Sequence, residues 1–177
     1  GTRTGIFNLF YGLPGTYWSA FSANQVPPVL MSSFQKHDYE LGVYAAAPLT
    51  QPAFDRTVFA GVKDLKLRGD GNLPWQLDEK LTDNWMKFIE EKTQLPEADS
   101  KPFFGFLFYD GIHGTSLPEG AEKPFLPSWN RVDHLSLNKD FDSTAYFNLY
   151  KNSAFQVDKQ LKRVFDQLNE KDLLDEP

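Results

Sequence analysis

Residues 1–15 read GTRTGIFNLFYGLPG, and this stretch says more about the fold than any other part of the chain. Thr2 lies ten residues ahead of Gly12 with no proline between them. The segment therefore predicts a short helix that the glycine ends. Two interpretations of Thr2 stay open. Its hydroxyl is either an N-cap of this helix or part of a site where unpaired N–H groups and the helix dipole attract a phosphate or sulfate ester.

The next part of the chain predicts short helices and strands in turn. Residues 26–36 predict a helix with two prolines, Pro27 and Pro28, in its first turn, and the apolar residues 41–47 predict a buried strand. Residues 53–59 predict another short helix. Residues 62–67 alternate apolar and charged side chains, which predicts a half-exposed strand.

The second half of the chain predicts a helix, a strand and a long helix. Apolar residues from Leu81 to Ile89 share one helical face, with Asp78 as a candidate N-cap. Residues 103–109 form an uninterrupted apolar run, which is typical of a strand covered on both faces. Residues 146–168 repeat apolar positions every three or four residues, as one amphipathic helix does. This order of elements indicates an α/β fold.

Composition limits the function. The chain has 177 residues, a net charge of −6 and a pI near 5.0, so it lacks the basic surface that a nucleic-acid partner requires. It has no cysteine, which excludes disulfides and thiolate ligands. No apolar run approaches the roughly 20 residues that a membrane-spanning helix needs.

Three stretches resemble, in this order, segments of the alkaline phosphatase and sulfatase superfamily. They are the opening segment up to Gly15, the apolar run and histidine of residues 102–113 (PFFGFLFYDGIH), and the helix that starts at residues 146–153 (YFNLYKNS) and continues to residues 170–175 (EKDLLD). Residues 4–12 and 39–44 look most like the YejM-like (PbgA) family. Members of that family are inner-membrane proteins with a periplasmic sulfatase-like domain.

The resemblance implies a fold and a domain organisation. It implies an α/β fragment of the three-layer sulfatase and alkaline phosphatase fold, with a mainly parallel sheet flanked by helices. Residues 1–177 would form a single partial domain, and we expect the chain to be an internal piece of a larger one. Residues 111–138 lack any period and are expected to form an irregular excursion within it.

The resemblance also implies roles for individual residues. Thr2 occupies the position of the superfamily's nucleophile by its spacing to Gly12, and Arg3 is a candidate clamp for an ester oxygen. His113 follows the apolar strand, where α/β sheets place their ligands, and Asp110 is beside it. Asp110 and His113 are therefore candidate substrate-binding residues, although a purely local structural role for His113 stays open. We expect structural roles for the other histidines, His37 and His134.

A divalent metal is the superfamily's cofactor, and the resemblance places its ligands outside this chain. Carboxylates from an earlier strand and an Asp-His pair from a later strand hold the metal in the superfamily. We therefore expect a metal only in the full-length domain, and no metal-ligating residue is assigned here. Since the chain has no cysteine, formylglycine sulfatase chemistry is not expected.

Two functions follow from these expectations. The first is a sulfatase-like module at the periplasmic face of the inner membrane. It would be a non-catalytic regulatory or binding domain linked to cardiolipin or lipopolysaccharide, with its membrane segments outside this chain. The second is a metal-dependent hydrolase or transferase of phosphate or sulfate esters with Thr2 as nucleophile. A scaffold without a site is a third interpretation.

Lipid contact has its own candidate segment. Residues 125–129 (FLPSW) include a tryptophan, which favours the membrane interface, and the cations Lys123, Arg131 and Lys139 flank them. We expect any contact with an anionic lipid outside the opening segment to lie here.

Overall fold

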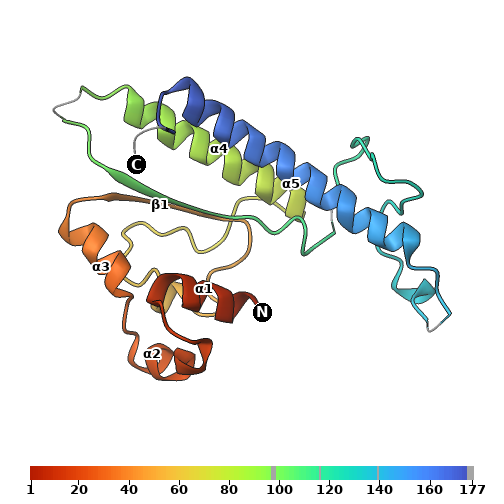
Figure 1. Ribbon diagram of the computed structural model, residues 1–177, viewed down its shortest axis with the longest axis horizontal. Helices are drawn as coiled ribbons and strands as arrows, with labels where there is room; N and C mark the ends of the chain where they lie inside the picture. The colour runs from red at the N-terminus through yellow and green to blue at the C-terminus, as the bar shows by residue number, and fades with distance from the viewer. Residues whose placement is uncertain (97–98, 116, 139, 175–177) are drawn as a thin grey trace.

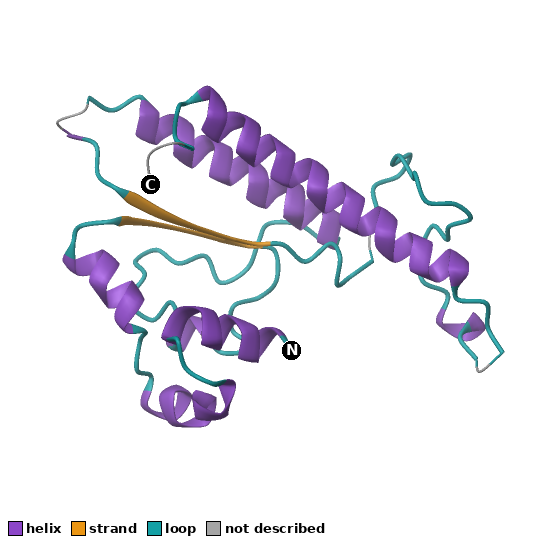
Figure 2. Ribbon diagram, in the orientation of Figure 1, coloured by secondary structure: helices purple, strands orange, loops and turns teal. Residues whose placement is uncertain are grey.

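A two-stranded parallel sheet lies between two groups of helices (Figures 1 and 2). The computed structural model describes residues 1–96, 99–115, 117–138 and 140–174. The helices and strands are α1 (Thr2–Tyr11), α2 (Trp18–Asn24), α3 (Val29–Lys36), β1 (Glu40–Ala45), α4 (Pro74–Thr93), β2 (Phe103–Phe108) and α5 (Thr144–Glu170). The short 3₁₀ turns are η1 (Gly15–Tyr17), η2 (Phe54–Arg56) and η4 (His134–Ser136). The expected α/β class is confirmed.

The parallel pairing of the strands runs from Glu40 opposite Phe103 to Ala45 opposite Phe108. Because side chains alternate along a strand, β2 supplies aromatic side chains to both faces. On the first face Phe10 of α1 lies 5.3 Å from Phe106, measured between ring centroids. This face forms the largest core cluster, whose buried members include Phe7, Phe10, Trp18, Met31, Val43, Leu49, Phe54, Val58 and Phe59.

The second face of the sheet is covered by α4 and α5. Trp85, Phe88 and Ile89 of α4 are buried there together with Val164 of α5. The ring of Trp85 lies against Gly105 of β2, where a Cβ atom would come within 2.3 Å of a ring carbon. The glycine in the middle of this apolar strand therefore makes room for the indole.

The boundaries of the first helices match their sequence signals only in part. Gly12 ends α1 with a φ of 65°, a left-handed conformation that glycine adopts without strain. The helix predicted at residues 26–36 begins later, at Val29, with Pro28 as its N-cap, so the two prolines precede its first turn. However, the N-cap of α1 is Gly1, and no side chain caps this helix. The interpretation of Thr2 as an N-cap is wrong.

Two predicted elements between the strands differ from the structure. Residues 62–67 form a loop and not a strand, because Asp64 has a φ of 54° and breaks the extended conformation. Val62 and Leu65 still pack against the core, which explains the alternation of apolar residues. The helix predicted at residues 53–59 is reduced to the single turn η2.

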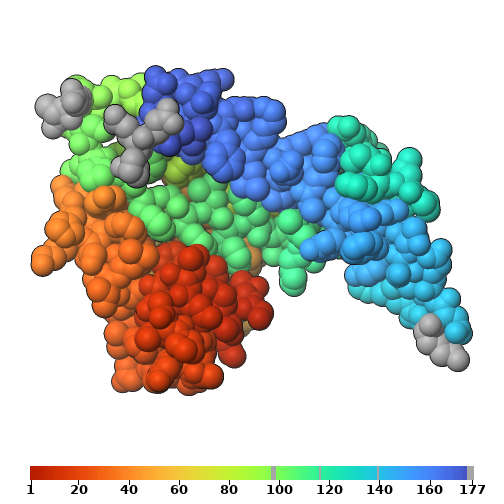
Figure 3. Space-filling view, viewed as in Figure 1, coloured from red at the N-terminus to blue at the C-terminus, as the bar shows by residue number. Residues whose placement is uncertain are grey.

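The N-terminal half of α5 projects past α4 and the sheet, and residues 117–138 and 140–143 fold beside it (Figures 1 and 3). We call these residues together with residues 144–156 the arm. The expected excursion over residues 111–138 falls mostly within the arm and consists of loops, turns and η4. Within the described residues, no helix combines the length and the apolar composition needed to cross a bilayer.

Gly105→Ala tests the packing of Trp85 on the strand. The added methyl group meets ring carbons at 2.3 and 2.4 Å, so we expect a loss of about 1–3 kcal/mol in the free energy of unfolding. Urea denaturation followed by circular dichroism measures this loss. The control is Gly5→Ala in α1, where no atom lies within 4 Å of the new Cβ and alanine should stabilise by about 0.5–1 kcal/mol. Equal midpoints for the two variants would contradict this account.

Candidate functional site

The N-terminus of α1 lies at the edge of the sheet toward which both strands run (Figure 1). A series of ring contacts connects the first turn of α1 with the end of β2. The guanidinium of Arg3 lies 5.8 Å from the ring centroid of Trp18, and Trp18 lies 5.9 Å from Phe54. Phe54 in turn lies 6.4 Å from Phe108, the last residue of β2. The opening segment and the end of β2 therefore share one edge of the fold.

The first turn of α1 makes this edge electropositive. Thr2 and Arg3 are exposed in that turn, which contains no acidic residue and no side-chain cap. The first hydrogen bond of the helix joins the Gly5 N–H to the Gly1 carbonyl. Since the N–H groups before it have no partner inside a helix, they and the helix dipole favour an anion at this end. Arg3 adds a full positive charge.

Asp110 and His113 follow β2 at the same edge and lie together. The Nδ1 atom of His113 is 3.5 Å from an Asp110 carboxylate oxygen. The imidazole is 91% exposed, whereas the carboxylate is mostly covered. Burial raises the pKa of the Asp110 carboxyl, and the neighbouring His113 opposes this rise. Among the described residues, no hydrogen bond or ion pair joins this pair to Thr2 or Arg3.

A buried carboxylate fixes the turn that carries Asp110. Asp78 lies in the second turn of α4, and its two oxygens accept hydrogen bonds from the N–H groups of Asp110 and Gly111, each at 2.8 Å. A Cβ on Gly111 would lie 2.4 Å from the Asp78 Oδ2 atom, so only glycine allows this approach. Burial raises the pKa of Asp78 to about 6, and the two backbone hydrogen bonds oppose the rise.

The predicted N-cap role of Asp78 is therefore wrong. The N-cap of α4 is Leu73, whose N–H donates to the Gln76 side chain at 3.1 Å. Sequence reasoning missed the true role of Asp78, although a signal was present. Asp78 shares the helical face of the buried Thr82 and Trp85, and a carboxylate on a buried face needs partners of its own.

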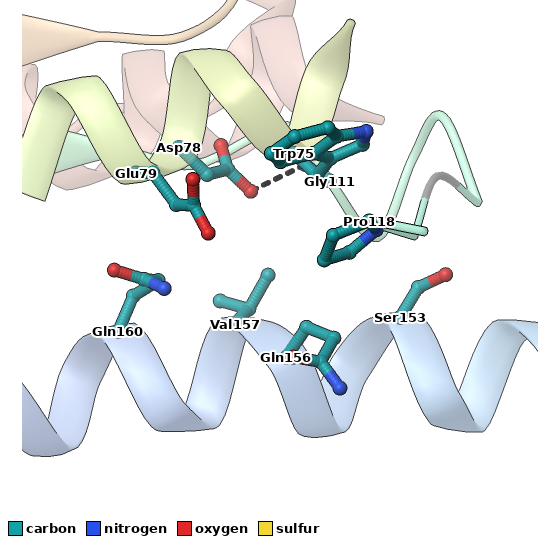
Figure 4. Close-up of a pocket in the computed structure, with 9 residues that line it drawn as sticks. All are labelled: Trp75, Asp78, Glu79, Gly111, Pro118, Ser153, Gln156, Val157 and Gln160. Carbon is teal, nitrogen blue, oxygen red and sulfur yellow. Dashed lines mark hydrogen bonds between the residues drawn. The ribbon is translucent and has the colours of Figure 1, made fainter. Parts of the chain in front are cut away.

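A small cavity lies beside Asp78, between α4, α5 and the loop after β2 (Figure 4). Its volume of about 20 Å³ has room for about one water molecule. Figure 4 shows side chains from the two helices facing one another across it: Trp75, Asp78 and Glu79 from α4 and Ser153, Gln156, Val157 and Gln160 from α5. This cavity is too small for an ester substrate.

The described residues do not form a complete set of metal ligands. Asp110 and His113 supply two donors at most, and no group of three His, Cys, Asp or Glu side chains suited to a metal ion occurs in the described part of the chain. His37 is the C-cap of α3, and His134 begins the exposed turn η4.

The burial of Asp78 predicts that stability depends on pH. Because burial raises the pKa of Asp78 in the folded chain to about 6, above the ordinary range of an aspartate, the fold favours the protonated form. The stabilisation from protonation is present at low pH and is lost as the pH rises through about 6. Between pH 7 and pH 5 the wild type should gain about 1 kcal/mol relative to Asp78→Asn.

Urea denaturation of both proteins over this pH range measures the difference. Parallel stability curves for the wild type and Asp78→Asn would show that Asp78 does not titrate there.

Gly111→Ala is an independent check of the Asp78 contact. The variant should lower the free energy of unfolding by about 1–3 kcal/mol, because the added methyl group displaces the Asp78 carboxylate.

Comparison with known proteins assigns the family. The Sulfatase family model matches residues 1–176. Two proteins named Inner membrane protein YejM, from Salmonella typhimurium strain LT2 and from Salmonella typhi, are each 20% identical to this chain over 172 residues. The matched region covers 96% of this chain and 23% of each relative, so the chain spans about a quarter of their length. The chain belongs to the Sulfatase family.

Proposed function

We propose that this chain is part of a sulfatase-like module at the periplasmic face of an inner-membrane protein, and that the module binds an anionic lipid without turning it over. The observation that carries the proposal is the electropositive first turn of α1, with Thr2 and Arg3 exposed at the edge where both strands end. The relatives, which are named as inner membrane proteins, support a place beside that membrane.

The groups at this edge suit a phosphate. Free N–H groups at a helix N-terminus donate hydrogen bonds to phosphate oxygens, and an arginine binds two of those oxygens at once. The Arg3 guanidinium already lies over the Trp18 ring, which limits the positions that its side chain takes. Cardiolipin and lipopolysaccharide, the lipids that the family resemblance implies, both carry phosphate groups.

A second candidate is a metal-dependent hydrolase or transferase of phosphate or sulfate esters. The observation in its favour is Thr2, whose exposed hydroxyl lies at the first residue of α1 and does not cap the helix. A threonine hydroxyl is a weak nucleophile until a base or a metal activates it. The described residues supply no complete ligand set for such a metal.

Arg3→Gln tests the binding proposal. We expect glycerol phosphate, the headgroup core of phospholipids, to shift the amide resonances of residues 3–5 in an NMR titration. Loss of a charged hydrogen-bond donor should weaken binding about tenfold. The control Lys36→Gln removes an exposed cation at the opposite end of β1 and should leave the affinity unchanged. Equal affinity of the wild type and Arg3→Gln would contradict the proposal.

Thr2→Ala separates binding from turnover. The full periplasmic domain is assayed with Mn²⁺ and p-nitrophenyl phosphate, and the proposal expects no hydrolysis above background. Hydrolysis that Thr2→Ala abolishes would support the second candidate and overturn the non-catalytic assignment. Hydrolysis that Thr2→Ala leaves unchanged would show that Thr2 is not the nucleophile.

A further inference from the structure

The arm exposes a group of large apolar side chains around one lysine. Leu126 is 73% exposed and Phe147 is 54% exposed, and Phe125 and Tyr150 are also exposed beside them. We call these four residues and Lys151 the arm patch. A folded domain rarely exposes several large apolar side chains together unless they contact a partner.

Lys151 lies among the rings of the arm patch. Its ammonium is 4.7 Å from the ring centroid of Phe147 and 5.5 Å from that of Phe125. The rings of Phe147 and Tyr150 stack at 6.2 Å with an angle of 5° between their planes. No carboxylate in the described part of the chain pairs with Lys151. The arm patch is therefore apolar and carries a positive charge that no ion pair neutralises.

Two buried asparagines hold the arm patch in place. The side chain of Asn152 accepts a hydrogen bond from the Phe125 N–H at 3.1 Å and donates one to the Phe125 carbonyl at 3.0 Å. Asn148 donates to the Pro127 carbonyl at 2.9 Å. Because these bonds fix residues 125–127 against α5, the arm patch needs little ordering when it binds.

We propose that the arm patch docks onto a bilayer surface that contains anionic phospholipids. This inference rests on the proposed function, which places the domain beside the inner membrane. Aromatic rings and lysine suit the headgroup region, where Phe125, Leu126 and Phe147 enter the acyl boundary and Lys151 reaches a lipid phosphate. An unpaired cation in apolar surroundings matches the negative charge of such a surface.

This surface shares Phe125 and Leu126 with the segment that the sequence predicts and differs in its other residues. Trp129 is partly buried, because it packs against Phe141 and Tyr146 at 5.2 and 5.6 Å inside the arm. Lys123 donates a hydrogen bond to Asn130. Arg131 is exposed and forms no hydrogen bond or cation–π contact with the described residues of the arm patch, and the predicted cation Lys139 lies outside the described residues.

Vesicle flotation of the 177-residue chain tests the proposal. The vesicles contain phosphatidylcholine alone or a mixture with phosphatidylglycerol. We expect binding to the mixed vesicles, and Leu126→Asp should weaken it at least about tenfold because the side chain no longer enters the lipid. The matched control is Val29→Asp on α3, since Val29 is 81% exposed and lies outside the arm. It should bind as the wild type does.

Lys151→Gln tests the charge separately. It removes the charge, keeps a polar side chain only one atom shorter, and should weaken binding to the mixed vesicles about fivefold. Binding to phosphatidylcholine alone should not change. Circular dichroism of each variant confirms that α5 is intact.

Three results would overturn the proposal. The first is that the wild type does not bind the mixed vesicles, and the second is that Leu126→Asp binds them as well as the wild type does. The third is that the chain sediments as a dimer that Leu126→Asp dissociates. The last result would assign the arm patch to a protein interface.

The glycerol phosphate titration at α1 does not involve the arm patch. A failure there together with normal vesicle binding would overturn the proposed anion site and leave the docking surface standing.

Discussion

The parallel pairing of β1 with β2 is the constraint on which the rest of the structure depends. It presents Phe106 and Phe108 to the helices before β1 and turns Phe103 and Leu107 toward α4 and α5. Since side chains alternate along a strand, a shift by one residue would exchange these faces and leave the Trp85 indole opposite a phenylalanine instead of Gly105. The same pairing brings both strand ends to one edge, where α1 begins.

Asp78 connects this core to the candidate site. A carboxylate inside a fold loses its hydration, and only strong hydrogen bonds offset that loss. Here the two N–H donors belong to the residues directly after β2, so the bonds that stabilise the carboxylate also fix the turn that carries Asp110 and His113. This arrangement requires glycine at position 111, because a Cβ there would clash with the Asp78 carboxylate. The positions of Asp110 and His113, the candidate substrate-binding residues, thus depend on a side chain from α4.

Local signals predicted most of the elements, and distant contacts explain the errors. Gly12 and Pro28 mark helix ends by their own backbone preferences, and the apolar run of β2 needs no knowledge of its partners. Asp78 resembles an N-cap locally, but its partners lie 32 and 33 residues away. Residues 62–67 alternate like a strand because two of them pack on the core from a loop. At the candidate site, the sequence placed Asp110 and His113 after β2, but contacts of the fold show that Arg3 shares their edge.

The two proposed lipid contacts differ in their physics, and that difference determines how they combine. The first turn of α1 offers N–H groups and Arg3, so its attraction is mainly electrostatic and salt weakens it. The arm patch relies on Leu126 and aromatic rings, whose transfer from water depends little on salt. Where one bilayer reaches both contacts, they act together, because the first raises the effective concentration of the second. The proposed pair would then hold an anionic membrane firmly while each contact alone stays reversible.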